Sequence, residues 1–354
     1  MSHVSRPFTP QLAPRRVLVA MSGGVDSSVA AALMLEQGHD VTGVTLKLWG
    51  GDSDSGCCSV SDVEDARRVA AQLGIPHYVF NFGDDFDAHV VDPYVRAYTS
   101  GVTPNPCVEC NRSIKFGRLL ERAAALGFDS VATGHHARII HDSDGAPRLR
   151  RGADAAKDQS YVLYMLDAEQ LARTLLPVGD LTKAEVREHA ARLGLRTAAK
   201  PESMDVCFIA RGGREAFLAA RTELRPGPVV DLTGAVVGAH EGVALLTVGQ
   251  RRGLRVATGE RRYVVDVDAA IDTVTIGTRD ELLRDTVELR DLCFVHAPPG
   301  DRRLVAQVSA HGRPLPGRLD GDVVRLDARH PRVAPGQVVA LYDGDELLGG
   351  GIAR

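Results

Sequence analysis

Apolar and polar positions follow two different patterns along the chain. The first 140 residues alternate short apolar runs with stretches of helical period, which is typical of a parallel sheet flanked by helices. Strands are expected at residues 15–20, 41–48, 77–82 and 130–133. Helices are expected at 26–37, from a capping box at Ser61 and Glu64 to Gly74, and at 84–98 and 112–126.

The pattern changes in the second half of the chain. Residues 158–195 have a helical pattern, with a second capping box at Thr182 and Glu185. After about residue 225, short Val-rich runs such as 262–266 and 337–342 alternate with Gly, Pro and Asp, which indicates an all-β region. We therefore predict an α/β protein with a flexible tail (1–14), a doubly wound parallel-sheet catalytic domain (15–215), a central small α/β domain (216–284) and a C-terminal β-barrel-like domain (285–354).

Composition narrows the class of protein. The chain has 354 residues, enough for two or three domains, and no apolar run near the ~20 residues that span a bilayer. Its first 14 residues lack the apolar stretch of a signal peptide, so we expect a cytoplasmic protein without membrane contact. Six cysteines are too few for a disulfide framework. A net charge of −4 argues against nonspecific coating of nucleic acid but leaves room for a local basic face.

Lysine is rare and unevenly placed. Only five of the 42 basic residues are lysines, and all five fall in the first 200 positions: Lys47, Lys115, Lys157, Lys183 and Lys200. Codon bias toward Arg is the simplest explanation. However, a site that needs a compact point charge would resist replacement by a planar guanidinium.

A phosphate-binding loop is predicted directly after the first strand. Residues 21–28 read M-S-G-G-V-D-S-S, and the two glycines permit a tight turn whose N–H groups face inward at a helix N-terminus. Ser22, Ser27 and Ser28 can donate to phosphate oxygens, and Asp26 is a candidate ligand for Mg²⁺. A plain strand-to-helix turn is the alternative for a bare G-G pair, but the longer motif favours phosphate. It is not a Walker A loop, because no G-K-[ST] follows.

Two cysteines are candidates for sulfur chemistry. Cys110 follows two prolines, in a loop expected just before the helix at 112–126, where the positive helix end, Arg112 and Lys115 would favour a thiolate. Cys207 lies in a short extended segment at 201–209. The adjacent Cys57 and Cys58 are expected in a loop near the site, and Cys293 is expected as a small buried hydrophobe. Two other roles for the C-x-x-C of Cys107 and Cys110 are less favoured. A zinc site would need a second pair of ligands, which the sequence does not show. A redox pair would normally stand at the start of a helix without two prolines nearby.

The loop at 22–27 resembles the pyrophosphate loop of the N-type ATP pyrophosphatases, the PP-loop superfamily. That resemblance implies cleavage of ATP between its α and β phosphates, with AMP left on a substrate oxygen. Six further segments match bacterial tRNA-specific 2-thiouridylases in order and approximate spacing. They are T-P-N-P-C-V-E-C-N-R-S-I-K-F at 103–116, T-G-H at 133–135, K-D-Q-S-Y at 157–161, D-V-C-F-I at 205–209, T-V-G-Q-R-R-G-L at 247–254 and P-G-Q-V-V-A-L-Y at 335–342.

The resemblance implies ATP-dependent 2-thiolation of the wobble uridine in tRNAs for Lys, Glu and Gln, a sulfurtransferase reaction giving 2-thiouridine, AMP and pyrophosphate. It implies Cys110 as nucleophile and Cys207 as carrier of the persulfide. ATP would be contacted by Ala20, Met21, Ser22, Gly23, Gly24, Val25, Asp26, Ser27, Leu46 and Gly134. The target base would meet Asn105, Pro106 and Cys107, and tRNA would meet His135, Lys157, Asp158, Gln159 and Gln337. A cysteine desulfurase or a relay protein would supply the sulfur, and a monomer is expected.

Two positions depart from the family pattern, and three alternatives remain. Many relatives have Asp where this chain has Cys107, and some have Met where it has Leu46. Cys107, Cys110 and Cys207 could instead hold an iron–sulfur cluster that carries the sulfur. The chain could also be a tRNA-binding sulfur-relay protein without ATP chemistry, or another synthetase of the same ATP fold.

In the β region, candidate contacts to tRNA phosphates are Arg251, Arg252, Arg261, Arg262, Arg313, Arg318 and Arg325.

Overall fold

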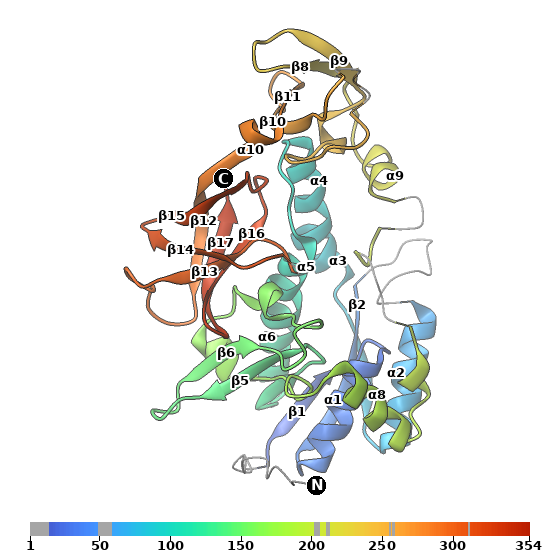
Figure 1. Cartoon of the computed structure of the whole chain (residues 1–354). Helices are drawn as coiled ribbons and strands as arrows, with labels where there is room; N and C mark the ends of the chain where they lie inside the picture. Colours follow the sequence, from blue (N-terminus) through green and yellow to red (C-terminus); the bar gives the residue numbers. More distant parts are fainter. Residues whose placement is uncertain are drawn as a thin grey trace.

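The computed structural model describes residues 14–48, 59–201, 206–209, 213–254, 256, 259–310 and 312–354. Cys57 and Cys58, and nearly all of the predicted tail, lie outside the described residues. Figure 1 shows three regions: a parallel sheet with helices around it, a small sheet at the far end, and a barrel beside the long helices. Among the described residues, none of the helices has the length and apolar character needed to cross a membrane.

A parallel sheet organises the N-terminal region, as the sequence predicts, but it has five strands where the sequence predicts four. Its strands are β1 (Arg16–Ala20), β2 (Asp40–Lys47), β3 (His77–Asn81), β4 (Ser130–Ala132) and β7 (Thr174–Leu175). They run in the order β3-β2-β1-β4-β7, and every neighbouring pair is parallel. The chain leaves β1 toward β2 and later returns to its other side with β4. In such a sheet, a crevice opens beyond the carboxyl ends of the strands where the order reverses.

Helices cover both faces of this sheet because successive strand residues point to opposite sides. Val17 and Val19 pack in one core with residues of α1 (Val25–Glu36), α2 (Val60–Leu73) and α8 (Lys183–Arg192). Leu18 packs in a second core on the other face. Two long helices lie there, each interrupted by a π-helical stretch. The first comprises α3 (Gly83–Phe86), η1 (Asp87–Val91) and α4 (Asp92–Thr99); the second comprises α5 (Pro106–Glu109), η2 (Cys110–Arg118) and α6 (Leu119–Ala125).

Helix boundaries follow the capping residues. The predicted box at Thr182 and Glu185 is confirmed and starts α8. The predicted box at Ser61 and Glu64 is wrong: α2 begins two residues earlier, because Ser59 accepts a hydrogen bond from the Asp62 N–H at 3.1 Å. The helical pattern predicted over 158–195 is also interrupted. It contains η3 (Ser160–Leu163), α7 (Ala168–Ala172) and strand β7 before α8, and η4 (Arg196–Ala199) follows α8.

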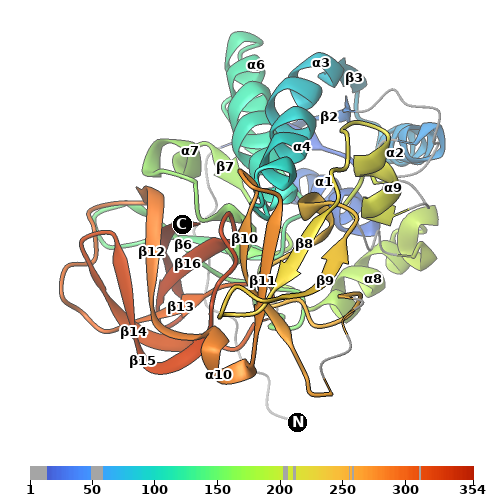
Figure 2. The same ribbon diagram turned by 90° about the horizontal axis from the view of Figure 1, so that it is seen from above.

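The central region forms a separate four-stranded sheet. It comprises α9 (Gly213–Ala219), β8 (Gly227–Val230), β9 (Val236–His240), η5 (Val243–Leu245), β10 (Tyr263–Asp268), β11 (Thr273–Gly277) and α10 (Arg279–Leu282). The strand order is β10-β11-β8-β9, and the region has its own core around Val264, Val274 and Ile276. Figure 2 shows this sheet beside the barrel and distinct from it.

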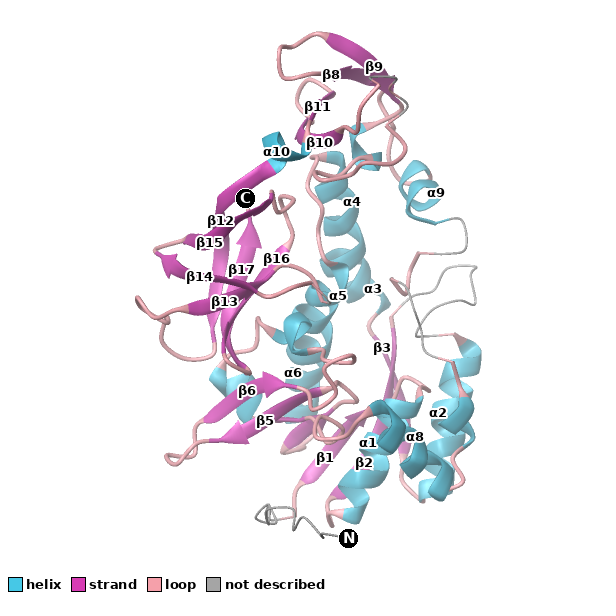
Figure 3. Ribbon diagram, in the orientation of Figure 1, coloured by secondary structure: helices cyan, strands magenta, loops and turns pink. Residues whose placement is uncertain are grey.

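The C-terminal region is a closed barrel of six strands, as predicted. They are β12 (Leu283–Phe294), β13 (Leu304–Gln307), β14 (Leu315–Asp320), β15 (Val323–Pro331), β16 (Val338–Asp343) and β17 (Glu346–Ala353), and pairing of β12 with β17 closes the barrel. A hairpin of β5 (Ala137–His141) and β6 (Pro147–Arg151) from the N-terminal region adds to β17 (Figure 3). Arg138 and Arg150 both pair with Asp345 across this junction.

Candidate functional site

A cavity of about 360 Å³ lies at the carboxyl edge of the parallel sheet. Its walls come from the segments that follow β1 and β4 and from the end of β2, which is where the reversal of strand order opens a crevice. Residues lining it are Ala20, Met21, Ser22, Gly24, Val25, Asp26, Ser27, Val44, Thr45, Leu46, Leu48, Asp62, Lys115, Thr133, Gly134, His135, His136, Lys157, Gln159, Lys183, Lys200 and Pro201. Apolar side chains and charged groups therefore meet in one space, as a nucleotide requires.

The predicted phosphate loop forms one wall of this cavity and is tightly fixed. Gly23 has φ of +74°, and a Cβ there would lie 2.3 Å from the carbonyl oxygen of Asp62. Ser22 donates its backbone N–H to the Ser27 hydroxyl at 3.1 Å. Ser28, expected as a phosphate donor, is instead fully buried and donates its hydroxyl to the Gly24 carbonyl at 2.8 Å. Ser22 and Ser27 therefore face the cavity, whereas Ser28 stabilises the turn behind it.

A lysine and a histidine hold the loop carboxylate. The Lys183 ammonium donates to both oxygens of Asp26 at 2.7 Å, and His136 Nε2 lies 3.1 Å from Oδ1. Burial alone would raise the pKa of Asp26, but the hydrogen bonds from His136 and Lys183 outweigh it and hold that pKa below its ordinary value. Asp26 is therefore an anion with its charge largely compensated.

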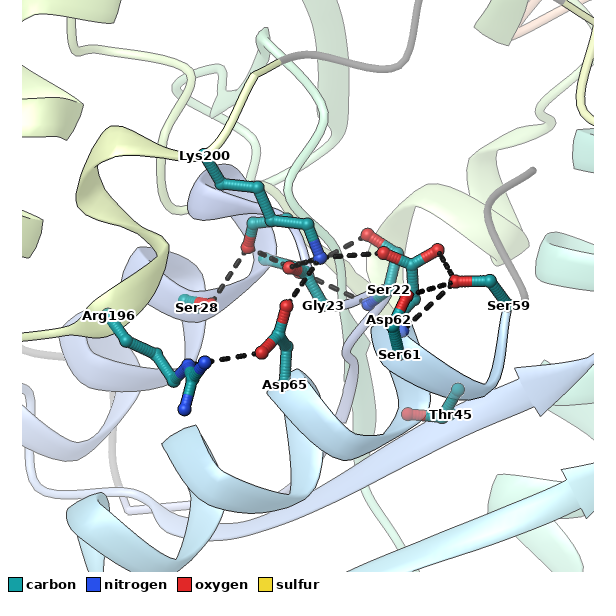
Figure 4. Close-up of polar contacts among 12 residues, drawn as sticks. Ser22, Gly23, Ser28, Thr45, Ser59, Ser61, Asp62, Asp65, Arg196 and Lys200 are labelled. Atoms are coloured by element: carbon teal, nitrogen blue, oxygen red, sulfur yellow. Dashed lines mark hydrogen bonds and ion pairs between the residues drawn. The ribbon is translucent and has the colours of Figure 1, made fainter. Parts of the chain in front are cut away.

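A second lysine connects the loop to helix α2. The Lys200 ammonium donates to the Gly23 carbonyl at 3.1 Å, to Asp62 at 2.6 Å and to Asp65 at 2.7 Å (Figure 4). Burial lowers the pKa of Lys200, but its hydrogen bonds to the two carboxylates outweigh burial and raise that pKa. Lys200 is thus a charged side chain at the edge of the cavity.

Four of the five lysines of the chain line this one cavity. They are Lys115, Lys157, Lys183 and Lys200, and they face two carboxylates, Asp26 and Asp62. The excess of two positive charges suits an anionic ligand. Sequence motifs do not assign Lys183, Lys200, Asp62 or His136 to the site, but the rarity of lysine points to the two lysines.

The structure brings nine of the ten predicted ATP-contacting residues to this cavity, and the tenth, Gly23, bonds to Lys200 through its carbonyl. Three of the predicted tRNA contacts, His135, Lys157 and Gln159, line the same cavity. Asp158 is buried and accepts hydrogen bonds from Gly152, Ser160 and Arg151. Gln337 lies elsewhere, at the barrel, and donates its side-chain amide to the Thr103 carbonyl at 2.8 Å.

His135 is buried at the inner wall of the cavity. Its Nδ1 lies 2.8 Å from the Thr133 hydroxyl, and its ring packs against Phe116. Burial lowers the pKa of His135 well below its usual value, and the nearby Lys115 acts in the same direction. The imidazole is therefore neutral at neutral pH.

The cysteine loop differs from its sequence prediction. The helix begins at Pro106, because the Asn105 side chain caps it by accepting from the N–H groups of Cys107 and Val108 at 3.1 and 3.4 Å. Cys110 therefore lies inside the helix and not ahead of its N-terminus, and Cys107 lies in the first helical turn. Cys107 is exposed, whereas Cys110 is buried. The same helix supplies Lys115 to the cavity.

Cys207 packs against the same apolar core that contains Cys110. Its neighbour Phe208 is buried against the rings of Phe86, Tyr94 and Phe217, which fixes this short segment on the helical layer. Cys293, expected as a small buried hydrophobe, lies half-buried in the barrel strand β12 and donates its thiol to the Met165 carbonyl.

Asn105 and Pro106 line a second cavity, of about 300 Å³, between the helical layer and the barrel. Glu109 and Arg112 from the cysteine helix and Arg290 from the barrel also line it. The candidate arginines for tRNA phosphates lie in the central region and the barrel, where six of the seven are exposed and Arg262 pairs with Glu260.

Comparisons with known proteins cover nearly the whole chain. The family model described as "tRNA methyl transferase HUP domain" matches residues 15–211, a "PRC-barrel domain" of the same family matches 215–278, and an "aminomethyltransferase beta-barrel domain" matches 286–353. The tRNA-specific 2-thiouridylase MnmA of Chloroflexus aurantiacus is 51% identical over 352 residues, which cover 96% of this chain and 98% of that protein.

Two further proteins of that name match the chain to a similar extent. The proteins of the same name from Roseiflexus sp. and Heliobacterium modesticaldum are 49% and 48% identical over 96% and 95% of this chain, and the matches cover 99% and 91% of those proteins. A solved 4-thiouridine synthetase–RNA complex with bound ATP is 18% identical over 55% of this chain and 45% of that one, with a TM-score of 0.35. The chain belongs to the family of tRNA-specific 2-thiouridylases.

Proposed function

We propose that this protein catalyses ATP-dependent 2-thiolation of the wobble uridine in tRNAs for Lys, Glu and Gln, giving 2-thiouridine, AMP and pyrophosphate. One observation carries the proposal beyond family membership: the helix that bears Cys110 also places Lys115 in the phosphate-loop cavity. An ATP site and a sulfur site would therefore share one structural element.

Adenylation makes the thiolation possible. The C2 oxygen of uracil is a poor leaving group, because its carbonyl is stabilised like that of a urea. Attack of this oxygen on the α-phosphorus of ATP would expel pyrophosphate and leave AMP on the oxygen. The backbone N–H groups after Ser22, the positive end of α1 and the lysines of the cavity would stabilise the charge that develops on pyrophosphate.

The cavity also suits Mg²⁺ that arrives with ATP. This ion is usually held by one or two carboxylates together with substrate phosphates, and Asp26 and Asp62 both line the cavity. Both carboxylates are paired with lysines, so binding the ion would require an exchange of partners. The ion would neutralise charge on the departing pyrophosphate.

Two cysteines would then transfer the sulfur. The terminal sulfur of a persulfide on Cys207 would attack C2, and AMP would leave. The Cys110 thiolate would next attack Cys207 Sγ, which breaks the bond to the transferred sulfur and leaves that sulfur on C2. The resulting Cys110–Cys207 disulfide would need two electrons from an external thiol before the next cycle. A cysteine desulfurase, acting directly or through a relay protein, would supply the persulfide.

Four alternatives have less support. Phosphate-loop geometry has no purpose in a sulfur relay without ATP chemistry or in methyl transfer, the activity in the family-model description. Other synthetases of the fold have no need for Cys110 and Cys207. An iron–sulfur cluster needs three converging ligands. In the part of the chain that the structure describes, which includes all three candidate cysteines, no group of three or more His, Cys, Asp or Glu side chains is placed to hold a metal ion.

The test is sulfur incorporation into unmodified tRNA-Lys transcript with ATP, Mg²⁺ and a cysteine desulfurase system. Wild type would be compared with Cys107→Ser, Cys110→Ser and Cys207→Ser, with Cys293→Ser as the matched control in the barrel. We expect 2-thiouridine to disappear only with Cys110→Ser and Cys207→Ser. Equal loss with Cys107→Ser, together with bound iron, would favour a cluster, and inactive wild type in an assay validated with a known thiouridylase would refute the function.

A further inference from the structure

Lys200 is held at the mouth of the phosphate loop by three acceptors. Its ammonium bonds to the Gly23 carbonyl of the loop and to the carboxylates of Asp62 and Asp65 on α2 (Figure 4). These three contacts occupy all three N–H donors of the ammonium. The simplest interpretation of such a side chain is a structural clamp, meaning a fixed link between the loop and α2.

Two observations show that a clamp is not a sufficient explanation. Lys200 lines the ATP cavity, and its side chain is 27% exposed. Asp65 also pairs with Arg196 at 3.1 Å, and Arg196 does not line the cavity (Figure 4). The same carboxylate therefore has one cation that faces the ligand space and one that does not. Arg196 therefore already compensates the charge of Asp65 and ties α2 to η4, so this carboxylate does not need Lys200 as a static partner.

The carboxylates also keep partners when the lysine leaves. Asp65 retains Arg196, and Asp62 retains the Ser59 hydroxyl, which donates to it at 2.6 Å. Neither carboxylate is therefore left without a hydrogen-bond donor, so the cost of an unsatisfied acceptor is avoided. A lysine is also suited to changing partners, since its ammonium is a compact charge on a flexible stem.

We infer that Lys200 is a phosphate-exchange residue: Asp62 and Asp65 hold its ammonium beside the loop, and the ammonium passes to the β- and γ-phosphates when ATP binds. The inference deepens the proposed function and rests on it. The position beside the Gly23 carbonyl puts the ammonium within reach of an anion seated on the loop. After adenylation, the two carboxylates compete with pyrophosphate for the Lys200 ammonium, and this competition assists the release of pyrophosphate.

The exchange is tested by equilibrium binding of ATP, pyrophosphate and AMP to the full-length protein without tRNA, measured by calorimetry. Lys200→Ala should bind ATP and pyrophosphate about 10- to 100-fold more weakly, the effect of one charge-assisted hydrogen bond. Its affinity for AMP should change less than about threefold, because AMP lacks the β- and γ-phosphates. Arg196→Ala breaks an ion pair with the same carboxylate and should leave all three affinities within about threefold.

Asp65→Asn provides an independent measurement with the opposite sign. Removing one competitor for the ammonium should tighten ATP binding by about three- to tenfold. Weaker or unchanged ATP binding by Asp65→Asn would overturn the proposed exchange. If Lys200→Ala does not fold, the Asp65→Asn measurement decides the question alone.

Other outcomes separate the inference from the proposed function. Lys200 would be only a clamp if Lys200→Ala and Arg196→Ala lost equal affinity for ATP. The same conclusion would follow if Lys200→Ala lost as much affinity for AMP as for ATP. If wild type binds ATP and Lys200→Ala binds it equally well, the inference fails while the proposed function stands. Wild type that binds no ATP would refute both.

Discussion

Lys183 bonds to both carboxylate oxygens of Asp26, 157 residues away in the sequence. Local signals explain how each residue reaches this position. The capping box of Thr182 and Glu185 starts α8 so that Lys183 is its first residue, and the Lys183 N–H is also fixed by Asp154 at 3.0 Å. Asp26 lies in the first turn of α1. Two helix starts therefore converge on one cavity.

Replacing Lys183 by Met should strongly impair adenylation. The variant would leave the Asp26 carboxylate with His136 and would set a less compensated negative charge against the phosphates of ATP. We expect kcat/KM for ATP to fall by about 10- to 100-fold, the effect of losing one charge-assisted contact. AMP formation in the presence of tRNA measures this directly.

Lys47→Met is the matched control for this substitution. Lys47 is exposed at the end of β2 and does not line the cavity, so its replacement removes an equal charge from outside the site. The two variants should differ by at least tenfold. Equal rates for both would mean that Lys183 does not act on ATP.

The two loop glycines should respond differently to alanine. Gly23 has a left-handed backbone, and its added Cβ would meet the Asp62 carbonyl oxygen at 2.3 Å. Gly24 has φ of −89°, and its Cβ would meet only the Ser22 hydroxyl at 3.5 Å. Gly23→Ala should therefore lower the free energy of unfolding by at least about 1–2 kcal/mol.

Urea unfolding of both glycine variants measures this difference. Gly24→Ala should unfold within about 0.5 kcal/mol of wild type. A Gly23→Ala protein as stable as wild type would show that the loop can shift away from α2.

Much of this fold could be predicted because its signals are local. The apolar runs at β1, β2, β3 and β4 and the glycines after β1 are visible in sequence, and the loop follows from them. The prediction omits the hairpin β5–β6, although the turn D-S-D-G at 142–145 is a local signal for it. It also omits the pairing of this hairpin with β17, where Leu149 lies opposite Leu347. No short-range pattern contains that pairing.

Within the candidate site, the motifs identify the loop but not the charges that surround it. Lys183 follows the predicted cap at Thr182, and Lys200 precedes the segment at 201–209. Neither signal points to the loop, which both lysines meet only through tertiary packing. The start of the cysteine helix, in contrast, had a readable signal. Asn105 followed by Pro106 is a favoured N-cap and first helical residue, and it competes with the expectation of a proline loop.

Asn105 offers a direct test of that helix start. Asn105→Ala removes the side-chain acceptor for two N–H groups and should destabilise the protein by about 1 kcal/mol. Asn105→Asp keeps an acceptor and should stay within about 0.5 kcal/mol of wild type. Urea unfolding gives both values, independently of any contact between Asn105 and the target base. Equal stability of Asn105→Ala and wild type would contradict the capping role.

His135 should make stability depend on pH below neutrality. Burial holds its pKa well below 6.5 in the folded chain, whereas the unfolded chain binds a proton near 6.5. Unfolding therefore takes up a proton below pH 6.5, and acid favours the unfolded state. The stability due to neutral His135 is fully present above pH 6.5 and is lost as pH falls below that value. The loss approaches about 1.4 kcal/mol per pH unit.

Comparison of wild type with His135→Gln isolates this contribution, because glutamine does not titrate. His39 and His77 also have pKa values lowered by burial, but they are present in both proteins and cancel in the difference. Urea unfolding between pH 5 and pH 8 should show that wild type loses stability more steeply than the variant below pH 6.5, with parallel curves above it. Parallel curves over the whole range would mean that His135 becomes protonated in the folded protein, which requires water to reach the inner wall of the cavity beside Thr133 and Phe116.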